Sequence, residues 1–163
     1  MNTGDAMEPE STDLAETDRQ AGCTLPPVPD GFVVTPCTNP KADPHLPAKP
    51  PRGAHHVATV EWSWSPGSSL ILSVLLSLDS AQRRWVLWHQ TYDDETWTWD
   101  PPRPVATAPR CALEPRTAAL LMLAQAWTDP DMRPSSDVFQ MVSDPGLLDE
   151  NELEDIEKVV WPK

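Results

Sequence analysis

The sequence predicts an α+β fold: an antiparallel β-meander of about four strands, followed by two or three helices packed on one face of the sheet. Residues 57–100 contain short stretches that alternate between apolar and polar side chains, with turn residues between them. Residues 115–161 contain segments with the start and stop signals of helices. The length of 163 residues fits one ordinary domain and excludes a large multidomain protein.

Residues 1–56 are predicted to form a Pro-rich, acidic N-terminal arm, irregular or folded against a single domain at residues 57–163. This stretch holds half of the 20 prolines and few large apolar residues, so it should not fold alone. Proline is rigid and packs well on an indole ring, so we expect part of residues 25–52 to lie across the Trp-rich sheet. We expect no secretory signal, mitochondrial presequence or membrane-spanning segment.

Four strands are predicted, at residues 60–65, 70–78, 85–88 and 96–99. In the first strand, Trp62 and Trp64 alternate with polar residues. In the last strand, Trp97 and Trp99 alternate with threonines, and Pro101-Pro102 then ends the sheet. The second strand carries leucine or valine at every other position, with isoleucine, leucine and serine between them, which is typical of a central strand.

Two further segments predict the first helices. Pro115 suits the first helical position, and the segment from there to Trp127 is apolar nearly all round, so this helix should be buried on most sides. Ser135 or Ser136 is a candidate cap for a short second helix that runs through Val142.

The last predicted helix begins after Asp149 and runs to Trp161, with a stripe of Leu, Ile and Val toward the core. Asp149 followed by Glu152 resembles a capping box. The carboxylates in this region are predicted to form a negative surface that docks onto a basic partner, the alternative being a solvated helix face. The residues of this acidic surface are Asp144, Asp149, Glu150, Glu152, Glu154, Asp155 and Glu157.

Six of the eight tryptophans fall in the predicted sheet. Trp85 and Trp88 are three residues apart, so their side chains should point to opposite faces of the sheet. At least one indole ring is therefore expected on the face that the helices do not cover. Two interpretations remain: the rings are core and surface covered by the chain's own arm, or they form a docking face for another chain. The candidate aromatic face comprises Trp62, Trp64, Trp85, Trp88, Trp97 and Trp99.

Motifs for catalysis or metal binding are not found in the sequence. It has no nucleophile elbow, Walker loop or dinucleotide fingerprint. The three cysteines and four histidines lack zinc-site spacing, and the acids after residue 148 lack the spacing of an EF-hand loop. We therefore predict no catalytic residues, no metal and no cofactor. The odd number of cysteines, without a CxxC pair, indicates reduced thiols and a cytoplasmic location.

The formal charge of −13 argues against direct binding to nucleic acids or anionic membranes. We therefore expect a non-enzymatic protein–protein interaction module whose partner has a basic surface. Acidic inhibitors and immunity-type proteins that block nucleic-acid-handling partners resemble it in composition. The alternative is a Trp-face module for a Pro-rich peptide, a sugar or a small apolar ligand, and homodimer formation also remains open.

Overall fold

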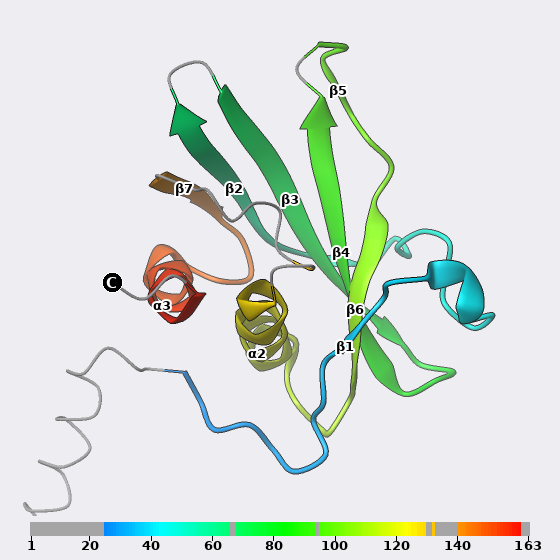
Figure 1. Cartoon of the computed structure of the whole chain (residues 1–163). Coiled ribbons are helices and arrows are strands. Elements are labelled where there is room, and N and C mark those ends of the chain that lie inside the picture. The colour runs from blue at the N-terminus through cyan, green and yellow to red at the C-terminus, as the bar shows by residue number, and fades with distance from the viewer. Residues whose placement is uncertain (1–24, 66–67, 94, 130–131, 133–139, 161–163) are drawn as a thin grey trace, which may run out of the picture.

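The computed structural model of the chain describes residues 25–65, 68–93, 95–129, 132 and 140–160. In these residues a seven-stranded antiparallel sheet carries two α-helices on one face (Figure 1). This arrangement confirms a mixed α+β fold.

The sheet is built from strands of very different lengths. In chain order they are β1 (Thr35–Pro36), β2 (His55–Ser65), β3 (Ser68–Asp79), β4 (Arg84–Asp93), β5 (Thr98–Trp99), β6 (Arg103–Pro109) and β7 (Gln140–Pro145). Their order across the sheet is β1-β6-β4-β3-β2-β7, and β5 pairs with β4 off this path. A short 3₁₀ helix, η2 (Pro40–Ala42), follows β1. The two α-helices are α2 (Pro115–Thr128) and α3 (Glu150–Val160).

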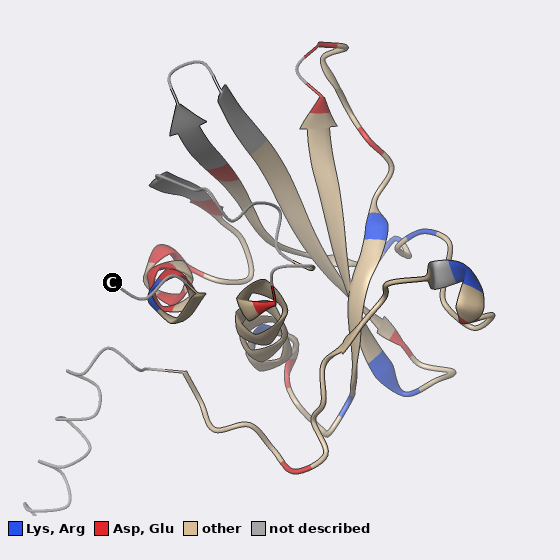
Figure 2. Ribbon diagram, viewed as in Figure 1, with Lys and Arg blue, Asp and Glu red and all other residues tan. Residues whose placement is uncertain are grey.

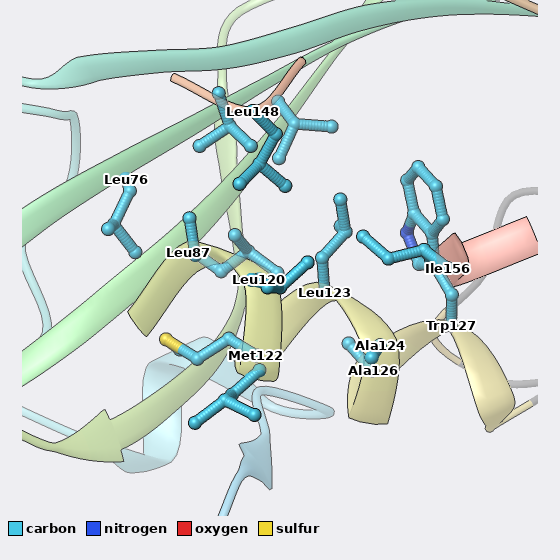
Figure 3. Packing of buried hydrophobic residues seen from close by; sticks show 14 of the residues in the cluster. Leu76, Leu87, Leu120, Met122, Leu123, Ala124, Ala126, Trp127, Leu148 and Ile156 are labelled. Carbon is cyan, nitrogen blue, oxygen red and sulfur yellow. The ribbon is translucent and has the colours of Figure 1, made fainter. Parts of the chain in front are cut away.

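The main core lies between the sheet and the two helices. The central strand β3 lies between β2 and β4, as its sequence predicts, and turns Leu72, Val74 and Leu76 into this core. Leu76 is paired with Leu87 of β4, and both side chains lie in the core on the face of the sheet that α2 covers (Figure 3). The apolar character of α2 is explained by its position, because it packs on both the sheet and α3.

Helix α3 begins with the predicted capping box. The Glu152 amide donates to Asp149 Oδ1 at 2.9 Å, and the Asp149 amide donates to Glu152 Oε1 at 3.0 Å. The predicted apolar stripe of Leu153, Ile156 and Val160 is buried against α2 and the corner before α3. Gly146 makes that corner: a Cβ there would lie 2.5 Å from His56 Nδ1, so only glycine fits without rearrangement. Trp161 lies outside the described residues.

The predicted number of strands is wrong. Strands β1, β6 and β7 were not expected, and of the fourth predicted strand only Thr98–Trp99 is extended and paired. The short helix through Val142 is also wrong, because Gln140–Pro145 form β7 and pair with β2; Ser135 and Ser136 lie outside the described residues. Pairing with a distant strand overrides the local helical spacing here.

The description of residues 1–56 as an irregular arm is wrong at β1. Thr35 and Pro36 pair with Thr107 and Ala106 of β6, and the next amide, of Cys37, donates to Val105 O at 2.8 Å. This short pairing extends the sheet by one strand and covers part of the β6 edge.

Candidate functional site

We call the face of the sheet that lies away from α2 and α3 its outer face. The two tryptophans of β4 lie on opposite faces of the sheet. Trp85 joins the core under the helices, whereas Trp88 lies on the outer face beside Ser77. The Trp88 indole N–H donates to Ser77 Oγ at 2.9 Å, and the ring has no exposed surface. These two residues of the predicted aromatic face are therefore closed to a partner.

The chain itself covers the lower part of the outer face. After η2 it passes on the side of the sheet opposite the helices (Figure 1), where Asp43 Oδ2 accepts a hydrogen bond from Arg84 Nη1 at 2.8 Å. Arg84 also pairs with Asp79 at 3.2 Å, so it joins this segment to β3 and β4. The hydrogen bond from Arg84 lowers the pKa of the Asp43 carboxyl.

The exposed tryptophans lie where β4 and β5 form a hairpin. We call residues 92–100 the aromatic hairpin. Trp97 is 77% exposed and Trp99 is 43% exposed. Tyr92 pairs with Trp99 across the two strands, and their rings meet edge to face with centroids 5.2 Å apart. This hairpin projects from one end of the sheet (Figure 1), so its indoles are accessible to a partner.

Trp97 has a backbone conformation that tryptophan rarely adopts. Its φ is 60°, in the left-handed region that favours glycine or asparagine, and a bulky residue there costs about 1–2 kcal/mol. Two local hydrogen bonds involve residues close to Trp97 in the chain. The Glu95 amide donates to Asp93 Oδ1 at 2.9 Å, and the Thr96 and Thr98 hydroxyls are 2.7 Å apart.

The aromatic hairpin is also acidic. Glu95 and Asp100 are exposed and Asp93 is half-buried, and residues 92–100 contain no lysine or arginine. Figure 2 shows acidic positions on both sides of the turn. The Asp100 amide donates to Thr91 O at 2.8 Å, which keeps this residue beside the strand pair. Exposed indoles and carboxylates thus share one small projecting element.

One arginine pairs with two of the seven residues of the predicted acidic surface. Arg116 of α2 donates to Glu152 Oε1 at 2.8 Å and to Asp149 Oδ2 at 3.1 Å. Its pKa is raised, first of all by the hydrogen bond to Glu152. Because these two carboxylates also cap α3, they are engaged within the chain. The other predicted residues lie on the outside of α3 or just before it (Figure 2): Glu150, Glu154 and Asp144 are exposed, and Asp155 and Glu157 are half-buried.

Trp62 and Trp64 belong to β2, where Trp62 is paired with Leu70 and Met141. Their side chains lie outside the described part of the structure, so the aromatic face is placed here only through the other four tryptophans.

His89 is the most deeply buried ionisable group of the sheet. Its Nε2 accepts a hydrogen bond from the indole N–H of Trp127 at 3.3 Å. Burial, assisted by the nearby positive charge of Arg103, lowers the pKa of His89 to about 3. The ring is therefore neutral at neutral pH and serves as a hydrogen-bond acceptor for α2. Within the described ranges, no three His, Cys, Asp or Glu side chains come close enough to hold a metal ion.

Cys37 lines two cavities, of about 330 and 260 Å³, beside β1. Burial raises the pKa of the Cys37 thiol, so the thiol stays protonated at neutral pH and is a weak nucleophile.

Comparison of this chain with protein-family models, curated proteins and solved structures finds no match. In the part of the chain that the structure describes, no helix has both the length and the apolar character needed to cross a membrane.

Trp97 and Trp99 belong to the aromatic face predicted from the sequence, but the carboxylates around them are not part of that prediction. The signal was available in the run from Tyr92 to Asp100, where acids flank the two tryptophans on both sides.

Proposed function

We propose that this chain is a non-enzymatic protein–protein interaction module that binds a partner with a basic surface through the aromatic hairpin. The observation that carries the proposal is Trp97, a large apolar side chain that is 77% exposed and held at a positive φ. Such a residue harms both solubility and backbone stability, so a role in the folded core does not explain it. Strained residues gather at functional sites, and exposed tryptophans are frequent binding hot spots.

The charge of the molecule supports a basic partner. The net charge of −13 attracts a positive surface over long distances and accelerates association at low salt. In this proposal the exposed carboxylates of α3, including Glu150 and Glu154, contribute to this attraction, while the indoles supply most of the contact energy. More specifically, we propose that the chain is an inhibitor or immunity-type protein of the cytoplasm. It would occupy the phosphate-binding surface of a nucleic-acid-handling partner.

The edge-to-face pair of Tyr92 and Trp99 favours a second candidate function. Two fixed rings form a platform on which a proline-rich peptide or a sugar can stack. Binding of that kind depends on the rings and little on charge, so its affinity should change little with salt.

The proposal is tested by affinity capture from the native host with the immobilised full chain. Three forms are compared: wild type, Trp97→Gly, and Ala112→Gly as a control at another exposed residue of positive φ. We expect a protein with a basic surface that wild type and the control retain, that Trp97→Gly loses, and that raised salt releases. Capture that is equal for all three forms would contradict the proposal. Capture that depends on Trp97 but withstands salt would favour the stacking platform.

A further inference from the structure

The aromatic hairpin combines two chemical features that recognise the same group. Trp97 and Trp99 expose indole rings, whose faces are negative and attract cations. Asp93, Glu95 and Asp100 place carboxylates on the same nine-residue element, which contains no positive side chain to neutralise them. The local surface therefore selects a cation with an apolar, flat face.

The geometry points to an arginine side chain of the protein partner as the group that the aromatic hairpin recognises. This inference rests on the proposed function and names the chemistry of its contact. A guanidinium is planar, stacks on indole and donates two parallel hydrogen bonds to a carboxylate. A lysine ammonium is more strongly hydrated and has no flat face, so it should bind more weakly.

The hairpin is organised before the partner arrives. Tyr92 contacts Trp99 edge to face, which restricts the orientation of that indole. The Glu95 amide donates a hydrogen bond to Asp93 Oδ1, which restricts the orientation of that carboxylate. Fixing these groups in advance lowers the entropy lost when an arginine is bound.

Charge complementarity argues against other occupants of this surface. A second copy of the chain would bring another net charge of −13 and another acidic hairpin, so the two would repel each other. A phosphate-bearing ligand is disfavoured for the same reason. An arginine on a basic protein surface satisfies both the rings and the carboxylates.

The inference is tested by NMR titration of the full chain with N-acetyl-arginine amide, with N-acetyl-lysine amide and N-acetyl-leucine amide as matched probes. The indole N–H signals are assigned with single Trp→Phe variants. We expect the arginine probe to shift the signals of Trp97 and Trp99 and to leave those of buried Trp88 and Trp127 in place. A cation–π contact at an exposed site should make the arginine probe bind about two- to fivefold more tightly than the uncharged leucine probe. The lysine probe, which has no flat face, should bind more weakly than the arginine probe.

Variants that remove carboxylate charge but keep the aromatic rings give a second test of the inference. Glu95→Gln with Asp100→Asn should weaken arginine binding to the hairpin at least twofold, whereas Glu114→Gln, at an exposed carboxylate before α2, should leave it unchanged. Equal shifts from the leucine probe, or no shift at Trp97 and Trp99, would overturn the arginine assignment. If a captured partner still requires Trp97 in that case, the proposed function stands and only the arginine assignment fails.

Discussion

At Trp97, the residue type that would suit the fold differs from the one that we propose for binding. Its left-handed backbone would suit glycine, and its side chain projects into solvent. We predict that Trp97→Gly raises the free energy of unfolding by between zero and about 1.5 kcal/mol. The substitution removes about 1–2 kcal/mol of backbone strain and costs about 0.5–1 kcal/mol because glycine is more flexible in the unfolded chain. Urea unfolding checks this, and a loss of more than 1 kcal/mol would show that the indole is structural.

Trp88 shows the opposite case, an indole that the fold needs. Replacing Ser77 with alanine removes the acceptor of the buried Trp88 N–H, so the protein should lose about 1–3 kcal/mol of stability. Ser80→Ala, in the exposed turn after the same strand, is the matched control and should stay within about 0.5 kcal/mol of wild type. Equal unfolding midpoints in urea for both variants would refute this assignment.

Among the elements, α3 could be predicted from the sequence because its signals are local. The capping pair and the apolar stripe lie within one short segment, so no distant contact is needed to recognise them. Strand β7 was misread because its extended form depends on pairing with β2, about 80 positions earlier in the chain. Strand β6 was missed because Pro104, Ala106 and Pro109 give it no alternating row of large apolar residues.

The N-terminal cap of α3 stabilises the first turn of this helix through Asp149. Asp149→Ala removes the side-chain acceptor of the Glu152 amide and one partner of Arg116. We expect a loss of about 1 kcal/mol from the cap and little more from the exposed ion pair. Hydrogen exchange should accelerate in the first turn of α3, and Glu154→Ala on the exposed side of the helix should not produce this change. Unaltered exchange in Asp149→Ala would argue against the cap.

At the scale of the whole molecule, the division of the tryptophans could not be read from the sequence. Periodicity assigns Trp85 and Trp88 to opposite faces, but it does not reveal that residues after η2 cross the outer face and join Arg84 through Asp43. Periodicity also does not reveal that the backbone of Trp97 has a positive φ in place of an extended conformation. Alternation fixes the face of a side chain, whereas its exposure depends on contacts between segments far apart in the chain.

The buried His89 makes the stability of the whole fold dependent on pH. The pKa of His89 is about 3 in the folded chain and near the ordinary 6.5 in the unfolded chain. As the pH falls, the unfolded chain therefore binds a proton at a higher pH than the folded chain does. The contribution of His89 to stability is therefore fully present above about pH 7 and is lost as the pH falls from 6.5 toward 3. At pH 5 the loss should reach about 2 kcal/mol relative to pH 7.5.

This dependence on pH is measured by urea unfolding at both values, with His89→Gln as the comparison because glutamine keeps an acceptor for Trp127 without titrating in this range. The variant should lose less stability than wild type between pH 7.5 and pH 5. The lowered pKa of Asp43 acts only at lower pH, below its ordinary value of 3.8, and so does not mask the effect. Parallel losses in the two proteins would contradict a neutral, buried His89.

The most direct test of the account is the dissociation constant between this chain and the protein it captures, determined for wild type and for Trp97→Gly at one low and one raised salt concentration. We predict that the variant folds as stably as wild type yet binds at least tenfold more weakly, and that added salt weakens the wild-type complex. An unchanged dissociation constant for the folded variant would show that the aromatic hairpin is not the binding surface.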